Sequence, residues 1–190
     1  MLEQENELLS AALEYAEKGI LVFPLEKYGK HMIKDSFFHK PSTNPDIIRQ
    51  WWDLIPRANI GIPTSLRRNK LIIIDIDINR MIDGRRSLAR LQAETGIVLP
   101  ETCMVQTGSG GYHLYYKNTT GKVYWGGNNV LPGIDVRSEN AHIVAPPSIH
   151  PNLKKYKWIK GDIEHITEAD ENVIQILMRI PKNKLSVKTE

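Results

Sequence analysis

One run of residues, 71–78, constrains the fold more than any other feature. All of its side chains are aliphatic except those of Asp75 and Asp77, which lie near its end. The run from Leu71 to Ile74 is entirely aliphatic, which favours a strand buried on both faces. Because successive side chains of a strand point to opposite faces, Asp75 and Asp77 are expected to project together. The sequence therefore predicts two carboxylates side by side at the end of a core strand.

Two neighbouring carboxylates at such a position repel each other and lose hydration. They are stable with a compensating cation or with a shared proton, and their oxygen atoms suit hard cations such as Mg²⁺ or Mn²⁺. The structural alternative is that Asp75 and Asp77 cap loops or pair with nearby arginines. The pair alone does not decide between these interpretations.

The rest of the chain mixes helical and strand patterns irregularly. An amphipathic helix is predicted over residues 8–16, ended by Gly19, and Asn44 with Pro45 starts another. Further helices are predicted from Asp83 to Gly96 and from a capping box of Thr167 and Asp170 to Ile180. Short strands are predicted at 20–23 (closed by Pro24), 103–106, 112–116, 134–136 and 142–145. This mixture favours an α+β or a two-lobed α/β fold.

Length and composition exclude several classes of protein. The 190 residues suffice for one domain or for two small lobes, and the net charge of +3 permits nucleic-acid binding without indicating it. A single cysteine, Cys103, excludes an internal disulfide and a multi-cysteine zinc site. The N-terminus has no apolar signal core, and no apolar run approaches the roughly 18 residues that a membrane span needs. A cytoplasmic protein without a membrane segment is expected.

A glycine-rich segment, residues 107–111, lies between two predicted strands and precedes His113. Its backbone N–H groups could approach phosphate oxygens. It matches neither a Walker loop nor a dinucleotide-binding fingerprint, because the Gly-Lys-Ser/Thr sequence is missing and a strand follows. An ordinary hairpin turn explains the same glycines, and His113 alone would more often be structural.

Two further groups of residues have open roles. Asp135 and Arg137 share a strand face, so Asp135 is either a third metal ligand or the partner of Arg137 in an ion pair, and Arg137 could reach a phosphate. The basic stretch 154–160 includes Tyr156 and Trp158. It either follows a template backbone and stacks bases, or forms a solvated edge strand with both aromatic residues in the core.

Taken together, these groups make up the inventory of two-metal phosphoryl transfer: paired acids, a phosphate loop that ends in a histidine, and a third acid with an arginine. Covalent catalysis is less favoured, because Cys103 has no basic partner near it in the sequence.

The order and spacing of these blocks resemble the bifunctional DNA primase/polymerase (prim-pol) domain of the archaeo-eukaryotic primase superfamily. The resemblance covers roughly residues 8–160. It is carried by Gly19–Leu25, Gly29-Lys30, the helix from Asn44 to Trp52, Ala58–Pro63, Asp75-Ile-Asp77, Thr107–His113, Gly133–Arg137 and Ala145–Ser148.

The resemblance implies a two-lobed fold, an α/β lobe plus an RRM-like lobe with the active site between them. It implies that Asp75, Asp77 and Asp135 bind Mg²⁺ or Mn²⁺ and that His113 contacts the incoming nucleotide. By the same resemblance, the triphosphate is expected near Ser109, Gly110, Gly111, Arg137 and Lys30. The catalytic domain is expected to span residues 1–181, followed by a polar tail or the start of a linker at 182–190.

The implied function is that of a template-directed nucleotidyltransferase, a DNA primase and polymerase that extends a 3′-hydroxyl and starts primers de novo. Single-stranded DNA template, primer and NTP or dNTP are the implied partners, with a helicase or another replication domain in a longer protein. Some relatives carry a cysteine-rich zinc element, which Cys103 alone cannot form. Two alternatives remain: a catalytically weak module that binds nucleotides or single-stranded DNA, and a metal-dependent nuclease.

Overall fold

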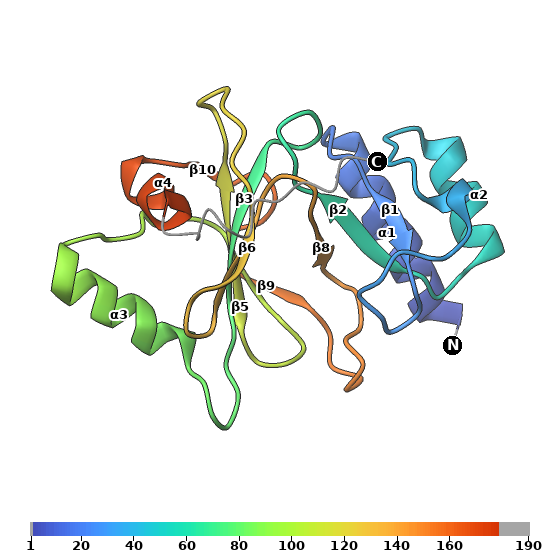
Figure 1. Ribbon diagram of the computed structural model, residues 1–190. Helices are drawn as coiled ribbons and strands as arrows, with labels where there is room; N and C mark the ends of the chain where they lie inside the picture. Colours follow the sequence, from blue (N-terminus) through green and yellow to red (C-terminus); the bar gives the residue numbers. More distant parts are fainter. Residues whose placement is uncertain (1, 179–190) are drawn as a thin grey trace.

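The computed structural model describes residues 2–178 and shows a mixed chain of helices and strands around two sheets, which confirms the predicted α+β class (Figure 1). The predicted tail at 182–190 and the predicted helix end at Ile180 lie outside the described residues. In chain order the elements are α1 (Leu2–Glu17), β1 (Phe23–Leu25), the 3-10 helix η1 (Ser36–Phe38), α2 (Pro45–Leu54), β2 (Asn59–Pro63), β3 (Leu71–Ile76), α3 (Gly84–Thr95), β4 (Met104–Gln106), β5 (Tyr112–Lys117), β6 (Gly127–Leu131), β7 (Ile134–Arg137), β8 (His142–Ala145), β9 (Lys157–Lys160), β10 (Thr167–Glu168) and α4 (Glu171–Met178).

The small sheet has the order β1-β2-β8 and is antiparallel. The strand predicted at 20–23 is displaced, because β1 includes Pro24 instead of ending before it. Proline lacks an N–H group and is tolerated where no ladder hydrogen bond is lost. β1 is the edge strand of this sheet, so Pro24 fits there.

Helices α1 and α2 pack beside the small sheet. α1 ends before Gly19, whose φ of 76° lies in the left-handed region that glycine adopts most readily. α2 begins as predicted, since the side chain of Asn44 accepts a hydrogen bond of 2.9 Å from the backbone N–H of Asp46. Its apolar face buries Ile48, Trp51 and Trp52 in the core shared with α1 and the small sheet.

The large sheet has the order β6-β7-β3-β5-β4-β9, and β10 pairs in parallel with β5. β3 lies between β7 and β5 and runs antiparallel to both. It ends at Ile76, two residues earlier than predicted. The N–H of Asp77 still donates to the carbonyl of Gly133 at 2.8 Å, but the carbonyl of Asp77 accepts from the N–H of Gly84 at 2.9 Å, and the chain turns toward α3.

The alternation of β3 divides the interior into two cores. Leu71 and Ile73 belong to the core formed with α1, α2 and the small sheet. Ile72, Ile74 and Ile76 belong to a second core with residues of α3 and α4. β3 is therefore covered on both faces, which explains its continuous aliphatic sequence.

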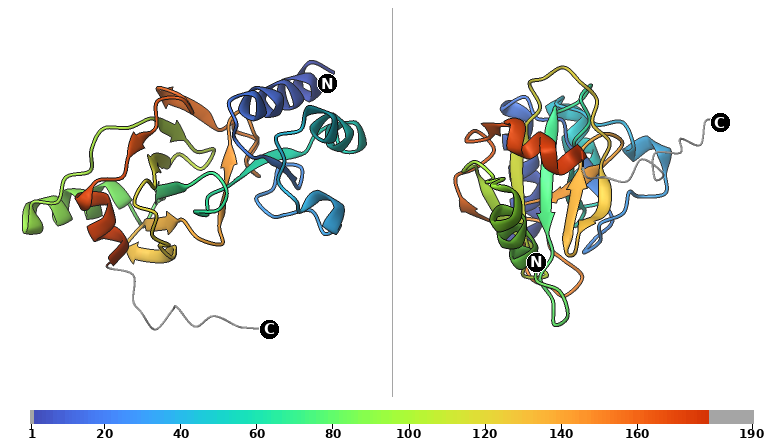
Figure 2. Two further views of the ribbon diagram at one scale, coloured as in Figure 1. Left: turned by 90° about the horizontal axis from the view of Figure 1, so that it is seen from above. Right: turned by 60° about the vertical axis from the view of Figure 1, so that its left-hand side comes forward.

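Helices α3 and α4 cover the second face, at the opposite end of the molecule from α1 and α2 (Figure 2). α3 matches its prediction, with Asp83 as the N-terminal cap and Gly96 in the left-handed conformation at its end. The capping box predicted for the last helix is wrong. Thr167 belongs to β10 and pairs with Tyr116 of β5, so its backbone is extended. The side chain of Asp170, without Thr167, accepts a hydrogen bond from the N–H of Val173 near the start of α4.

None of the helices within residues 2–178 combines the length and the apolar character that crossing a membrane requires.

Candidate active site

Three adjacent strands of the large sheet bring Asp75, His113 and Asp135 into one row. The register pairs Asp75 of β3 with His113 of β5 on one side and with Asp135 of β7 on the other. Directly paired residues of antiparallel strands project from the same face. That face also carries Ile73, which packs in the core next to the small sheet. The row therefore points toward the small sheet.

Asp75 lies near both His113 and Arg137, but neither contact is a short ion pair. Nε2 of His113 lies 3.5 Å from Oδ1 of Asp75, and Nη2 of Arg137 lies 3.7 Å from Oδ2 of the same carboxylate. The side chains of His113 and Asp75 are only 7% and 16% exposed. Charges held this far from bulk water interact more strongly than surface charges do.

Asp135 is engaged more tightly than Asp75. Nη2 of Arg137 lies 2.6 Å from Oδ2 of Asp135, and the N–H of Asn129 donates to Oδ1 at 2.8 Å. The other end of the Arg137 guanidinium donates to Oδ1 of Asn128 at 2.7 Å. Of the two roles left open for Asp135, the structure shows the ion pair.

Asp77 lies just beyond the end of β3, and its side chain is exposed. Partial desolvation of its carboxyl and the negative charges of Asp75 and Asp135 raise its pKa, against the opposing effect of Lys30 and Arg137. The three acids thus form one cluster of charge, with Asp77 at its open side. The alignment of Asp75 and Asp77 that the sequence predicts is consistent with this electrostatic coupling.

His113 is a buried and neutral base. Burial lowers its pKa, and the attraction of Asp75 opposes this only in part. Its Nδ1 has no hydrogen-bond partner among residues 2–178, although the atom is buried. An orphaned polar atom of this kind is costly unless a ligand or a water satisfies it.

A pocket of about 360 Å³ opens over this row and is lined by both sheets. The large sheet contributes Asp75, His113 and Arg137, and the small sheet contributes residues of β8. Lys30, which the family resemblance places near the triphosphate, also lines this pocket. The sequence analysis did not identify the lining residues His31, Asn140 and His142, and it named Tyr156 only as a base-stacking or core residue.

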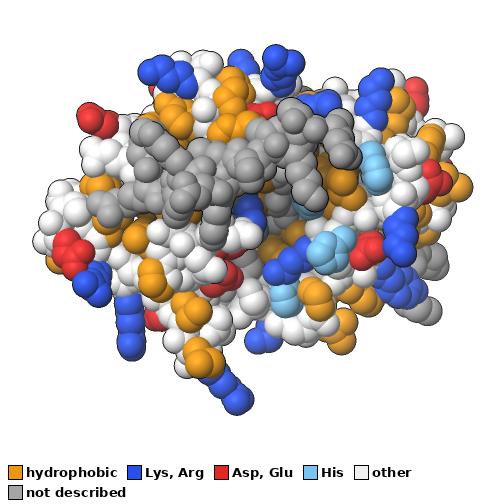
Figure 3. Space-filling view, viewed as in Figure 1, with side chains coloured by type: hydrophobic (Ala, Val, Ile, Leu, Met, Phe, Trp, Pro, Cys, Tyr) orange, Lys and Arg blue, Asp and Glu red, His pale blue; other side chains and the backbone are white. Residues whose placement is uncertain are grey.

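His142 shows why these residues were missed. Its Nε2 lies 2.9 Å from the carbonyl oxygen of Lys30, and its ring packs edge-on against Phe23. It therefore holds the loop after β1 against β8, on the wall opposite the acids. Figure 3 shows histidine and basic side chains gathered between the two halves of this face. Only the packing of one sheet on the other brings them to the acids, and no local pattern encodes that.

Segment 107–111 forms the hairpin turn between β4 and β5. The N–H of Thr107 donates to the carbonyl of Gly111 at 2.9 Å, so the turn is closed by its own hydrogen bonds. A Cβ at Gly111 would lie 2.2 Å from the carbonyl oxygen of Ile76, which holds the hairpin against the end of β3. Ser109 is exposed and Gly110 faces open space. The structural interpretation of the glycines is confirmed at Gly111, while Ser109 and Gly110 stay accessible beside the acids.

The donor set suits a divalent cation in its chemistry, but the geometry is not preformed. Three carboxylates face one arginine and one neutral histidine, so negative charge is left uncompensated at Asp77. Among residues 2–178, no cluster of three or more His, Cys, Asp or Glu side chains is arranged to hold a metal. Asp75 and Asp77 fit the role of ligands directly, and Asp135 fits it only once Arg137 has moved.

The aromatic residues of the basic stretch are structural. Tyr156 is 2% exposed and lies in the first core, with its ring centroid 6.1 Å from that of His113. Trp158 is partly buried against the same core, and its Nε1 donates to the hydroxyl of Tyr15 at 3.1 Å. Neither ring is presented for base stacking. A larger pocket of about 770 Å³ between α1 and β9 borders both residues but contains none of the acids of the row.

Comparison with known proteins gives one result. The family model described as Prim-Pol, the N-terminal domain of bifunctional DNA primase/polymerases, matches residues 12–172. That span contains the row, the hairpin and the walls of the pocket over the row. No curated protein matches the chain closely enough to be reported as a relative.

Proposed function

Since this chain belongs to the Prim-Pol family of bifunctional DNA primase/polymerases, we propose that it is a template-directed nucleotidyltransferase that adds nucleotides to a 3′-hydroxyl and starts primers de novo. The single observation that carries the proposal is the row of Asp135, Asp75 and His113 across three strands, facing a pocket with Lys30 on its far wall. A carboxylate and a guanidinium on one wall, Asp75 and Arg137, with Lys30 on the other, suit a substrate that is both a metal ligand and a polyanion.

We propose that the two sheets are the cores of the two lobes expected for this family. The large sheet with α3 and α4 on one face would be the RRM-like lobe, and the small sheet with α1 and α2 would be the α/β lobe. The pocket over the row is lined by residues of both, which supports a site between the lobes.

The acids would hold the metal ions. Asp75 and Asp77 are the primary ligands in this proposal, and Asp135 joins them when Arg137 exchanges its carboxylate partner for phosphate oxygens. Mg²⁺ or Mn²⁺ bound there supplies Lewis-acid activation of the 3′-hydroxyl and neutralises the triphosphate. The nearly buried side chain of Asp75 keeps this chemistry away from bulk water.

The remaining residues would bind and orient the nucleotide. Arg137 offers a planar fork suited to phosphate oxygens, and Lys30 offers a point charge from the opposite wall. The neutral imidazole of His113 presents an N–H group without adding charge to the site. Gly111 packs beside Asp77, and the exposed Ser109 of the same turn can offer its hydroxyl to phosphate oxygens. The N–H of Gly110 donates to the carbonyl of Thr107 at 3.0 Å, so its contact with phosphate would require this bond to open.

One gel assay tests this proposal against its alternatives. Wild type and Asp75→Ala/Asp77→Ala are incubated with a primed DNA template and Mn²⁺ or Mg²⁺, with and without dNTP or NTP. The proposal predicts extension by wild type only when nucleotide is present, and none by the double variant. Extension by the double variant at the wild-type rate would overturn the assignment of the acids. Shortening of the DNA without nucleotide would indicate a nuclease.

A second candidate function is a module that binds nucleotides or single-stranded DNA without incorporating them. The observation that favours it is the tight ion pair between Arg137 and Asp135, which occupies the third acid. This candidate predicts nucleotide binding by wild type with no product in the gel assay. Titration of a fluorescent nucleotide into the protein, with and without Mn²⁺, measures that binding separately from catalysis.

A further inference from the structure

The turn that joins β3 to α3, residues 78–83, begins directly after Asp77. The carboxamide oxygen of Asn79 accepts hydrogen bonds from the N–H groups of Met81 at 2.8 Å and Ile82 at 2.9 Å, and the N–H of Asn79 donates back to the carbonyl of Ile82. At its base, the N–H of Gly84 donates to the carbonyl of Asp77 at 2.9 Å. The turn is therefore shaped by its own hydrogen bonds and not by burial of its tip.

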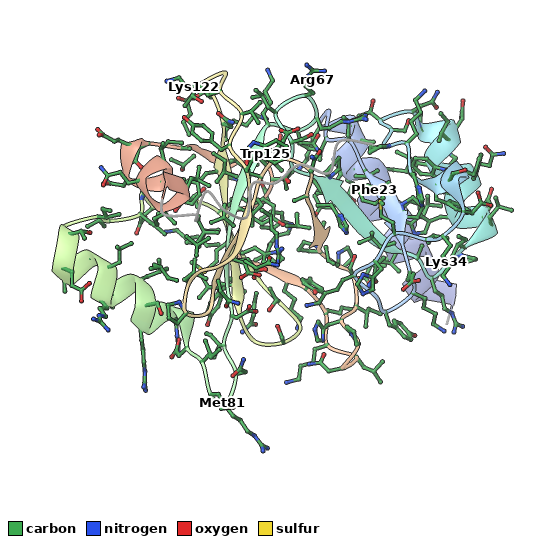
Figure 4. All side chains as sticks on the ribbon, viewed as in Figure 1. Phe23, Lys34, Arg67, Met81, Lys122 and Trp125 are labelled. Carbon is green, nitrogen blue, oxygen red and sulfur yellow. The ribbon has the colours of Figure 1, made fainter. Side chains whose placement is uncertain are left out.

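The tip presents Arg80 and Met81 to solvent. Met81 is 94% exposed and points away from the body of the protein in Figure 4. Arg80 is exposed and makes no ion pair within residues 2–178. A single exposed apolar side chain is ordinary on a protein surface. The position of Met81 is unusual, because Met81 follows Asp77 by four residues and is adjacent to Arg80, which makes no ion pair with another described residue.

A second turn with the same character, residues 150–154, lies on the other side of the hairpin. Leu153 is 69% exposed and has a φ of 67°, a conformation rare for a large side chain. Lys154, which follows it, is exposed and has no ion-pair partner among the described residues. An apolar tip next to a cation therefore occurs twice at this end of the molecule.

Close contacts join the second turn to the hairpin 107–111, and join the hairpin to the end of β3, from which the first turn begins. A Cβ at Gly108 would lie 2.2 Å from Cβ of His150, and Nδ2 of Asn152 donates to the carbonyl of Gly108 at 2.8 Å. On the opposite flank, Gly111 packs against the carbonyl of Ile76, which precedes Asp77 and the first turn. We call residues 78–83, 107–111 and 150–154 the loop rim.

Distance limits what the loop rim can reach. Four residues of extended chain span at most about 14 Å, so the backbone of Met81 lies within that distance of Asp77. A nucleic-acid duplex rises about 3.4 Å per base pair. The tip of the first turn therefore lies no farther from Asp77 than the length of about four base pairs of duplex.

We propose that the loop rim binds the base-paired end of the primer–template next to the reacting 3′-hydroxyl. Arg80 and Lys154 contact phosphates, while Met81 and Leu153 pack against the sugars and bases of the last pairs. The proposal rests on the proposed function, which places the 3′ end at Asp77. Nucleic acid is favoured over a protein partner because an uncommitted cation accompanies each apolar tip, which matches a ligand with alternating phosphate and apolar surface.

The test is a binding measurement that needs no catalysis. Fluorescence anisotropy of labelled DNA with a recessed 3′ end is compared for wild type, Arg80→Ala/Met81→Ser and a control, Arg67→Ala/Leu54→Ser. The control removes one exposed arginine and one leucine that is 63% exposed, and Arg67 lies on the opposite edge of the molecule from Met81 (Figure 4). The exposed positions make unchanged thermal unfolding the expected outcome for both variants.

We expect Arg80→Ala/Met81→Ser to weaken binding by at least about fivefold and to lower the slope of log affinity against log salt by about 1. The control should bind as wild type does. Wild-type affinity and salt slope in the rim variant would overturn the proposal. If wild type fails to extend primers while the rim variant still loses affinity, the proposed function fails, and only the binding of DNA by the loop rim is retained. If extension proceeds and rim variant and wild type bind alike, only the inference fails.

Discussion

At the scale of single residues, Asp77 is the acid whose charge the metal-free fold accommodates least. Asp75 has Arg137 and His113 within 4 Å, and Asp135 has an ion pair and a backbone N–H. Asp77 has the like charges of the other two acids, which together with burial raise its pKa. A carboxyl whose pKa is raised on folding stabilises the protein below its unfolded pKa and loses that contribution as the pH rises. At neutral pH its ionised form therefore opposes folding.

Asp77→Asn should consequently raise the free energy of unfolding at pH 7 in the absence of divalent cations, while activity is lost. The gain should stay below about 1 kcal/mol, because solvent and salt screen an exposed carboxylate, and it should shrink at high salt. Urea denaturation of the two proteins in chelator measures it.

Asp46→Asn is the matched control for this change. Asp46 lies in the first turn of α2, where a negative charge is favourable, so its neutralisation should lower stability slightly. A loss of stability in Asp77→Asn equal to that in Asp46→Asn would contradict the description of the cluster.

The residues of the row could be predicted from the sequence, whereas the contacts between its strands could not. Period-two alternation and the positions of Asp75, His113 and Asp135 on three short strands are local properties of the sequence. Asp135 and Arg137 lie two residues apart on β7, so their ion pair is one of the two roles that the sequence offers. The approach of His113 and Arg137 to Asp75 depends instead on the register of β3 with its two neighbours, which no local pattern states. The structure shows the ion pair of Asp135, and its role as a metal ligand stays a prediction.

At the scale of elements, the hairpin between β4 and β5 is held by a glycine contact. The carbonyl oxygen of Ile76 occupies the place where a side chain at Gly111 would begin. This contact sets the distance between the hairpin and Asp77, because Asp77 follows Ile76 directly. The accessible part of the hairpin, Ser109 and Gly110, depends on it for its position.

Gly111→Ala should therefore force β5 away from the end of β3 and destabilise the protein by about 1–3 kcal/mol, the usual cost of overpacking. Gly110→Ala is the comparison within the same turn. Its φ of 99° makes alanine unfavourable, but no atom lies within 4 Å of the added methyl group, so only the backbone cost remains.

Chemical denaturation ranks the two variants, and Gly111→Ala should be the less stable. It should also lose primer extension under conditions in which it is still folded. Equal stability of the two variants would show that the contact with Ile76 relaxes freely.

Element prediction failed where tertiary pairing overrode a local signal. Pro24 reads as a strand terminator but is accommodated at a sheet edge, and Thr167 reads as a helix cap but pairs with Tyr116. Asn44 and Gly96 were predicted correctly, because a helix cap and a left-handed helix end depend on the residue itself and its nearest neighbours.

At the scale of the whole molecule, the pocket exists because two sheets with separate sequence origins face each other. The acids come from the large sheet, and the opposite wall comes from β8 and the loop after β1. His142 joins that loop to β8 through the carbonyl of Lys30. The class of fold followed from the mixture of local patterns, whereas the docking of the sheets is a long-range property that the sequence patterns do not contain.

The central claim is that the row of acids under this pocket performs templated nucleotidyl transfer. The most direct test is single-nucleotide incorporation on a primed template whose next base is defined, with each of the four dNTPs supplied separately and Mn²⁺ present. Wild type should extend the primer by one residue with the complementary nucleotide, and the isosteric variant Asp75→Asn should be slower by at least about a hundredfold. Incorporation by Asp75→Asn at the wild-type rate, or incorporation by wild type that ignores the template base, would contradict the claim.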